Sequence, residues 1–471
     1  MLSYSFWRKH YLTRCPDRFL RNRVVCAGMN RSLKHLSFQS LRHGLTTLFR
    51  DIPDRRQKLK VDHSMHDVVM SGFAMMHFQD PSLLQFQERL RKGNGHDNLE
   101  TLFGVDTIPK ETQMWTVLDN LDREQFRPAF KNFTHRLQRG KHLEQYQLSD
   151  KSYLAVIDGT EYFRSIKLSC PACLKKNHKN EKSYSHQILQ GAIVHPNLKQ
   201  VIPLMPEEIR NTDGTEKQDC EINAGKRFIR QLRKDHPQMK FTIGGDGLNS
   251  KQPFIELIRQ EGMNFILVAK PDDHKIMMEW IGEQKALGEV KIKRVDDDKG
   301  RTHVYEWINQ VPLNGNKDSI LVGFFSYRIL TPDETGEKRA TFKYSWVTDF
   351  EMTLNNVEEL VRAGRARWKI ENECFNTLKN QGYHIEHNYG HGSKNLSFNF
   401  LLLTLLAFFC HQIAELTDSL YQQCRKQLGS KAELWNNVRV SIKLFVFDSW
   451  EMPFQFVLDP KSFQPSLIKP G

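Results

Sequence analysis

Three acidic residues stand where their neighbours are mostly apolar or small. Asp158 follows the apolar run 153–157, Asp246 lies in the glycine cluster 244–247 directly after another apolar run, and Glu371 lies in a segment with helical periodicity. A carboxylate that faces a protein core must be paired, protonated or bound to a metal, because an unpaired buried charge is costly. Carboxylate oxygens suit Mg²⁺ or Mn²⁺, and two such ions about 4 Å apart catalyse phosphodiester hydrolysis and transfer.

Each acid on its own also has an ordinary structural interpretation. Asp158-Gly159 is typical of a turn at a strand end, and an aspartate among glycines, such as Asp246, is typical of a loop. Glu371 could form a helical ion pair with Arg367, four residues earlier. The hypothesis of a two-metal site therefore depends on the three acids occurring together.

The elements between the acids determine whether they can meet. Short apolar runs predict five strands and two helices in the order β-β-β-α-β-α-β: strands 153–157, 187–194, 200–205, 240–243 and 265–269, and helices 216–235 and 253–258. This is the order of a ribonuclease H-like sheet, a resemblance that implies the strand arrangement 3-2-1-4-5. Strands one and four are then neighbours, so Asp158 and Asp246 are expected at the same sheet edge.

The third acid lies on a helix expected from Asn355 onward. At about 100° per residue, Trp368, Phe375 and Leu378 share a face with Glu371, so this carboxylate is expected on the apolar side of the helix.

Two basic residues of the same helix could bind a substrate phosphate. Arg367 and Lys379 lie within about 80° of Glu371 around the helix axis. The alternative interpretation is that both are ordinary solvated charges.

Composition excludes several classes of protein. An apolar fraction of 39% and a charged fraction of 26% over 471 residues are ordinary for a folded chain of several domains, so wholesale disorder and collagen-like repeats are excluded. The net charge of +13 is uneven, because residues 1–60 hold 14 Lys and Arg against 3 Asp and Glu, or +11, which leaves +2 for the rest. The basic end could be a nucleic-acid-binding arm, an inert extension or a transit peptide.

The location of the protein is predicted from its apolar segments and cysteines. The longest apolar run, 400–410, is shorter than the roughly 20 residues of a membrane span, so a buried core helix is expected and no membrane association. Eight mostly isolated cysteines argue against a disulfide framework and favour a reducing cytoplasm. Phosphate-loop and dinucleotide-binding motifs do not occur in the sequence, so no nucleotide cofactor is expected.

The sequence predicts an α/β protein with a mixed ribonuclease H-like sheet and flanking helices, a β-rich insertion and an all-helical N-terminal domain. The helical domain could bind DNA or serve only in packing. The predicted boundaries are 1–60 for the basic arm or extension, 61–150 for the helical DNA-binding domain, 151–284 for the first part of the core, 285–350 for the insertion, 351–415 for the second part of the core with the catalytic helix, and 416–471 for the C-terminal region.

The segments around the three acids resemble a known family. Segments 157–163 (IDGTEYF), 244–250 (GGDGLNS) with 265–271 (FILVAKP), and 365–371 (RARWKIE) look like the three acidic motifs of the DDE transposases of bacterial insertion sequences. The 124 residues between the second and third acids are similar to the branch that carries a β-strand insertion there.

This resemblance implies a DNA transposase that cuts transposon ends and transfers the strands into target DNA. Asp158, Asp246 and Glu371 would be catalytic and would bind two Mg²⁺ or Mn²⁺ ions. Double-stranded DNA, as terminal repeats and as target, would be the partner, and a homodimer would hold the paired ends. In the family motif Tyr-x2-Arg-x3-Glu-x6-Lys, Arg367 and Glu371 match, whereas Gly364 replaces the tyrosine.

Two further positions depart from, or extend, the family pattern. The lysine position of the motif is occupied by Leu378, with Lys379 one residue later. The related branch flips a base onto an aromatic residue, for which Trp307 or Trp346 is a candidate, although core packing is the preferred interpretation of both.

Two rival functions remain open at this point. One is a transposase-derived metal nuclease or DNA-binding protein without integration activity. The other is a DNA-binding protein whose three acids are structural.

A second metal site is suggested by the pair Cys170-Pro-Ala-Cys173, which has the spacing of zinc ligands. His186 and His178 together, or either of them with Cys220, could complete a structural Zn²⁺ site, and the predicted ligands are Cys170, Cys173, His186 and Cys220. The histidine-rich segment 384–391 is interpreted as a loop.

Overall fold

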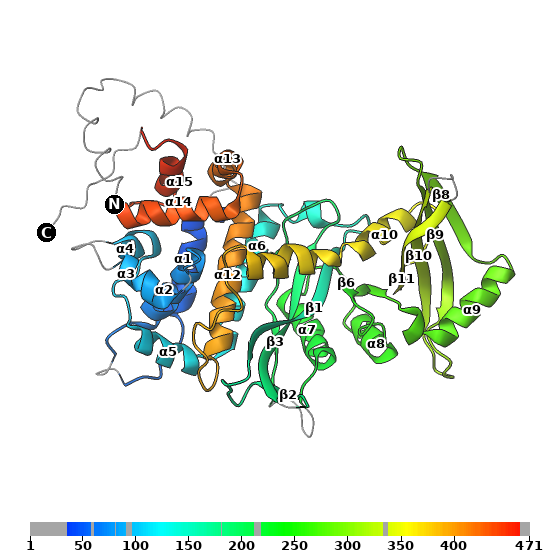
Figure 1. Ribbon diagram of the computed structural model, residues 1–471, viewed down its shortest axis with the longest axis horizontal. Helices are drawn as coiled ribbons and strands as arrows, with labels where there is room; N and C mark the ends of the chain where they lie inside the picture. The colour runs from blue at the N-terminus through cyan, green and yellow to red at the C-terminus, as the bar shows by residue number, and fades with distance from the viewer. Residues whose placement is uncertain are drawn as a thin grey trace.

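The computed structural model describes residues 35–57, 61–80, 82–90, 97–179, 181–211, 218–332 and 338–461. Over these residues the protein is a mixed α/β structure in which one 11-stranded sheet lies beside a helical unit (Figure 1). The arginine-rich stretch before residue 35, for which three roles are open, lies outside the described residues.

The helical unit is built from both ends of the chain, which lie together in the blue and the orange-to-red parts of Figure 1. It contains α1 (Phe38–Arg50), α2 (Met65–His77), α3 (Leu83–Leu90), α4 (Asn98–Phe103), α5 (Glu111–Asn120), α6 (Arg127–Arg139), α12 (Leu396–Thr417), α13 (Ser419–Leu428), α14 (Lys431–Leu444) and α15 (Glu451–Leu458), with short 3₁₀ turns at Arg123–Phe126 and Glu144–Tyr146. The predicted C-terminal region is therefore part of this unit.

Helix α12 is the core of the helical unit. It contains the apolar run 400–410 and packs against α2, α5 and α6. It is the one described helix long and apolar enough to cross a membrane, and 94% of its most apolar window is buried inside the protein. The prediction of a core helix is thereby confirmed.

Helix α1 places the start of the helical unit earlier than the predicted boundary at residue 61. Its residues Leu41, Leu45 and Phe49 are almost fully buried and face α2 and α6. Since these apolar residues recur at intervals of four, the helix presents one continuous stripe to the core.

The sheet has the strand neighbours that the sequence predicts for its first part. The strands are β1 (Tyr153–Ser165), β2 (Leu174–Asn177), β3 (Lys182–Val194), β4 (Ile202–Pro203), β5 (Glu207–Ile209), β6 (Phe241–Gly245) and β7 (Asn264–Val268). β3 pairs antiparallel with β1, β4 and β5 pair with β3, and β1, β6 and β7 are parallel in that order. Strands one and four of the prediction are β1 and β6, and they are neighbours.

Helices α7 (Glu221–Asp235) and α8 (Gln252–Gln260) connect these strands and pack against β3, β5 and β7. Their buried residues are spaced for one apolar face: Ala224, Phe228, Ile229 and Leu232 in α7, and Phe254, Ile255 and Ile258 in α8.

The inserted strands continue the same sheet. They are β8 (Lys291–Asp296), β9 (Thr302–Pro312), β10 (Leu321–Pro332) and β11 (Lys338–Thr348), preceded by a 3₁₀ turn at Pro271–Asp273 and by α9 (Lys275–Ala286). β11 pairs antiparallel with β7, so the sheet runs without interruption from the core into the insertion. The insertion is therefore fixed to the core through backbone hydrogen bonds.

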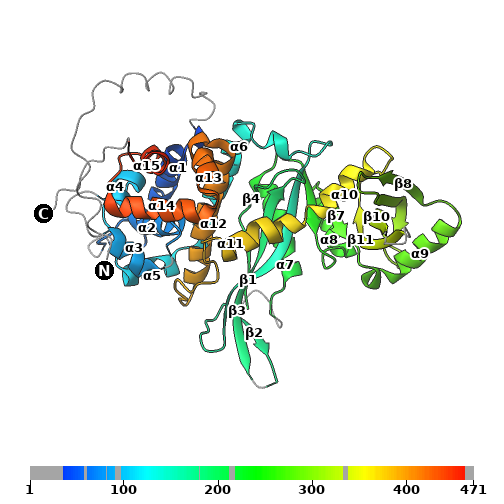
Figure 2. The same cartoon turned by 45° about the horizontal axis from the view of Figure 1, so that its top comes forward.

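The segment after the insertion is broken, where the sequence predicts one continuous helix. It consists of α10 (Val357–Arg365), a turn at 366–367, a π-helical stretch η7 (Ile370–Phe375) and α11 (Asn376–Asn380). In Figure 2 the yellow segment from α10 to α11 crosses the sheet from the insertion to the helical unit. π-Helical turns occur mainly at functional sites.

Substitution of a buried residue tests the inclusion of α1 in the fold. Leu45→Ala is expected to lower the free energy of unfolding by about 2–5 kcal/mol, because it leaves a cavity in the core. Thr47→Ala, at an exposed position of the same helix, is expected to change it by less than about 0.5 kcal/mol. Chemical denaturation of the full chain measures both, and equal stability of the two variants would exclude α1 from the core.

Candidate active site

Asp158 lies where β1 parts from β6. The parallel pairing of these strands ends at Val156 and Gly244, whereas β1 itself continues to Ser165 opposite β3. The predicted strand end at Asp158-Gly159 is therefore wrong, because the hydrogen bonds to β3 keep the chain extended. The exposure of β1 changes at this point, since residues 153–157 are buried and 158–161 are half-buried.

Asp246 follows the last residue of β6 and opens a tight turn. Its carboxylate accepts the backbone N–H of Leu248 at 2.9 Å, and its carbonyl accepts that of Asn249 at 3.1 Å. Because β1 and β6 are parallel neighbours, Asp158 and Asp246 both lie just beyond the carboxyl end of the β1–β6 pairing.

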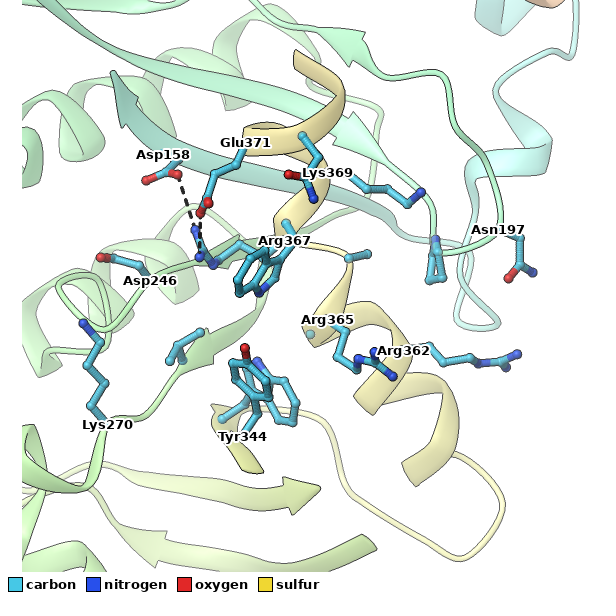
Figure 3. A pocket seen from close by; sticks show the side chains of 17 residues that line it. Asp158, Asn197, Asp246, Lys270, Tyr344, Arg362, Arg365, Arg367, Lys369 and Glu371 are labelled. Carbon is cyan, nitrogen blue, oxygen red and sulfur yellow. Dashed lines mark hydrogen bonds and ion pairs between the residues drawn. The ribbon is translucent and has the colours of Figure 1, made fainter. Parts of the chain in front are cut away.

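Arg367 links Asp158 to Glu371. Its guanidinium lies 3.4 Å from the Asp158 carboxylate and 2.8 Å from the Glu371 carboxylate, as the dashed lines in Figure 3 show. The Arg367 side chain is 15% exposed and that of Glu371 is 39% exposed. The predicted ion pair with Arg367 is thus present, and the same arginine also reaches the strand acid.

Glu371 points into a pocket, whereas the sequence predicts that it faces the apolar side of its helix. The turn at 366–367 and the π-helical geometry of η7 change the rotation per residue, so the 100° rule does not hold here. Leu378 and Phe375 are buried as expected, but Trp368 is 45% exposed.

The three acids and Arg367 line one pocket of about 710 Å³. Its walls come from the ends of β6 and β7, from the loop after β3, from β11 and from the α10–η7 segment (Figure 3). Four further cations line the pocket: Lys270, Arg362, Arg365 and Lys369. The pocket thus combines acids at its base with basic and aromatic side chains around them.

A fourth carboxylate, Glu221, lies beside this group. It is the first residue of α7, and it lies so close to Gly159 that a β-carbon on Gly159 would collide with its carboxylate. The sequence analysis missed Glu221, because an acid in the first turn of a helix is the ordinary choice there and carries no distinct signal.

The carboxylates disfavour one another's charge. Burial raises the pKa of Asp158 to about 6, with Glu371 and Asp246 adding repulsion and Arg367 opposing it. Burial likewise raises the pKa of Glu221 to about 7, and Asp246 and Asp158 add to this effect. The group therefore holds more negative charge than Arg367 alone compensates.

This donor set fits a hard divalent cation. All four side chains offer carboxylate oxygens, which Mg²⁺ and Mn²⁺ prefer, and their mutual repulsion would be relieved by a cation. Asp158, Asp246 and Glu371 do not, however, form a compact ligand cluster here, since the one group of described residues with three or more ligand atoms within 4.8 Å is a cysteine and histidine cluster elsewhere. Arg367 takes the position between Asp158 and Glu371.

Lys379 does not reach the pocket. It lies on α11 and forms an ion pair with Glu386 at 2.7 Å. Lys369 lines the pocket, and its ammonium donates to the carbonyl of Leu198 at 2.7 Å, which ties the α10–η7 segment to the loop after β3.

Gly364, which stands where the transposase motif has a tyrosine, has no room for a side chain. A β-carbon there would lie 2.7 Å from the Trp346 ring. Trp307 and Trp346 are each 1% exposed, which confirms the preferred interpretation that both pack in the core. Trp368 is the half-exposed indole of the pocket and lies edge-on to Tyr344, with ring centroids 6.5 Å apart.

Three of the four predicted zinc ligands lie together in the structure, and a residue that was not predicted lies in the place of the fourth. Cys170, Cys173 and His186 lie together, but Cys220 is exposed at the start of α7, away from them. The fourth member is His391, from the histidine-rich segment that the sequence analysis interprets as a loop. The sequence could not supply this pairing, because 204 residues separate His391 from His186.

No family model matches the chain, and a search of the curated proteins finds no significant match.

Removal of charge at the site is expected to stabilise the metal-free protein at high pH. The pKa of Asp158 in the folded protein is raised, so the folded state binds more protons than the unfolded state, and stability falls as pH rises through about 6. Asp158→Asn is expected to raise the free energy of unfolding by about 1–2 kcal/mol at pH 8 in a chelator, with no gain at pH 4.

The matched control for this measurement is Glu161→Gln on the same strand, where the carboxylate is paired only loosely with Arg164 at 3.9 Å. It is expected to leave the pH profile unchanged. Thermal denaturation across pH 4–8 compares the variants, and an Asp158→Asn profile that parallels the wild type would contradict the repulsion described above.

Proposed function

We propose that the protein is a metal-dependent DNA transposase that cleaves transposon ends and joins them to target DNA, with a ribonuclease H-like catalytic core. The observation that carries this proposal is the convergence of Asp158, Asp246 and Glu371 on one pocket lined by cations and aromatic rings. The strand order β3-β1-β6-β7, with β4 and β5 beyond β3, supports the ribonuclease H-like assignment.

The acids of the pocket are the groups that would hold the metal. Asp158, Asp246 and Glu371 offer oxygen ligands from a strand, a strand end and a helix, and Glu221 adds negative charge behind them. When bound, two Mg²⁺ or Mn²⁺ ions would lower the pKa of the attacking water or 3′-hydroxyl and stabilise the charge on the leaving 3′-oxygen.

Arg367 has two partners available in such a reaction. Without DNA its guanidinium is paired with Asp158 and Glu371. Its planar donor array also matches a phosphate, so it can turn to the scissile phosphate once the acids have another cation. Lys270, Arg362, Arg365 and Lys369 extend the positive surface along which a DNA backbone can lie.

Trp368 is the aromatic residue of this pocket that is accessible to a base. Its indole is 45% exposed, whereas Trp307 and Trp346 are buried. A base turned out of the duplex could stack on Trp368, beside Tyr344. Trp368 therefore replaces the two inserted tryptophans as the candidate for base stacking.

Neutral variants of the acids test the catalytic assignment. Asp158→Asn, Asp246→Asn and Glu371→Gln are each expected to reduce cleavage of the inverted repeats that flank the gene by more than about 100-fold, because even groups behind a metal ligand contribute 10- to 100-fold. Binding of the same DNA, measured by mobility shift, is expected to persist.

The control is Glu373→Gln, two residues from Glu371 and outside the pocket lining, which is expected to cleave normally. Retained cleavage in any of the three acid variants would remove that acid from the site. Joining of pre-cut ends to a target plasmid separates a transposase from a nuclease derived from one, because only the transposase performs strand transfer.

The role of Trp368 is tested with paired and unpaired substrates. Trp368→Ala is expected to slow cleavage of fully paired ends about tenfold, because base stacking on an aromatic ring contributes about 1–3 kcal/mol. Trp368→Tyr is expected to retain most activity. A substrate with a mismatch at the cleavage site is expected to rescue Trp368→Ala, and an equal defect on both substrates would argue against base stacking.

A further inference from the structure

Four metal-binding side chains meet at a place apart from the acids. Cys170 and Cys173 lie in the loop after β1, His186 lies on β3, and His391 lies between α11 and α12. Their ligand atoms all lie within 4.8 Å of one another. The chain brings them together from positions more than 200 residues apart.

The spacing of these atoms is that of a tetrahedral zinc site. Zn–S bonds of about 2.3 Å and Zn–N bonds of about 2.0–2.1 Å at tetrahedral angles place two sulfurs about 3.8 Å apart and a sulfur and nitrogen about 3.5 Å apart. The two Sγ atoms lie 3.7 Å apart, far beyond a disulfide bond. His186 Nε2 lies 3.5 Å from each sulfur, and His391 Nε2 lies 3.5 Å from Cys173 Sγ.

The cluster is partly enclosed, because Cys173 and His186 are buried whereas Cys170 and His391 are half-buried. Cys173 is 0% exposed and His186 is 2% exposed. The rings of Tyr162 and Phe163 cover the histidines, with centroids 4.6 Å apart between Phe163 and His391. The Glu208 carboxylate lies 4.0 Å from His186 Nδ1, the ring nitrogen that does not face the sulfurs, and this separation is beyond hydrogen-bond distance.

The backbone of the loop around His391 is fixed in a conformation that places this residue beside the cysteines. Gly392 has a φ of +64°, and a β-carbon there would collide with Leu396 and with Asp119. Asp119 accepts backbone N–H groups of the following residues, including that of Leu396 at 3.0 Å. The loop is thus held on its C-terminal side, and His391 is presented to the cysteines on the other.

We propose that Cys170, Cys173, His186 and His391 bind one structural zinc ion. The ion joins the β1–β3 hairpin to the segment that leads from the Glu371 helix to α12. Two thiolates and two imidazoles in tetrahedral arrangement favour Zn²⁺ over Mg²⁺ or Mn²⁺, which prefer oxygen. The site is closed, with four protein ligands, so it has no position for substrate.

Metal analysis of the purified full chain tests the proposal independently of any DNA activity. The wild type is expected to contain one zinc per chain by mass spectrometry. Cys173→Ser and His391→Ala are each expected to lose most of it, because a removed ligand weakens a closed site strongly. Cys220→Ser, which alters the exposed cysteine outside the cluster, is expected to retain one zinc.

Two further measurements keep the result decisive if a ligand variant fails to fold. Cobalt-substituted wild type is expected to show the visible bands of a tetrahedral site together with thiolate charge transfer. The Asp158→Asn variant is expected to keep its zinc, which separates this site from adventitious binding at the acids. Zinc-free wild type, zinc retained in Cys173→Ser and His391→Ala, or a cobalt spectrum without thiolate would each overturn the proposal.

Discussion

The parallel pairing of β1 with β6 is the constraint on which the candidate active site depends. It covers only four residues of each strand, from Tyr153 opposite Phe241 to Val156 opposite Gly244. Just beyond it β1 follows β3, β6 enters a turn, and an acid stands on each chain. The gap between the diverging chains is the base of the pocket, so the positions of Asp158 and Asp246 follow from the register of this short pairing.

Electrostatics then decide what the pocket can hold. Burial raises the pKa of Asp158 and of Glu221, and repulsion from the neighbouring carboxylates adds to this effect. Arg367 offsets part of this negative charge, because its guanidinium pairs with both Asp158 and Glu371. The acids at the base of the pocket thus carry more negative charge than Arg367 alone offsets, while the other cations of the pocket lie around them.

The sequence predicts that Asp158 and Asp246 lie together. It does not predict the direction of Glu371 or the presence of Glu221 and His391 at their sites. The strands are local patterns, so their predicted order places Asp158 and Asp246 close together, although the continuation of β1 past Asp158 depends on its pairing with β3. The sequence identifies Glu371 as a candidate but does not give the direction of its side chain, because a π-helical turn cannot be recognised from the spacing of apolar residues. Glu221 and His391 are placed by contacts across the fold, and Cys220 shows that spacing alone selects the wrong ligand.

The position of Glu371 depends on parts of the chain that lie far from it in sequence. A short helix interrupted by a turn and by π-helical geometry has little stability of its own, so its position must be fixed from outside. The insertion fixes its start, because β11 extends the sheet and packs Trp346 against Gly364. The loop after it is held by Asp119 of the helical unit.

The insertion and the helical unit therefore share one structural role, because both hold the segment that carries Glu371. Register between β11 and β7 places Trp346 opposite Val268, so the insertion and the core form the same part of the pocket wall. The other end is anchored through α12, which is buried against helices from the N-terminal and C-terminal parts of the helical unit. The segment that carries Glu371 is therefore held at both ends, by the insertion and by the helical unit, and this keeps Arg367 in the position between Asp158 and Glu371.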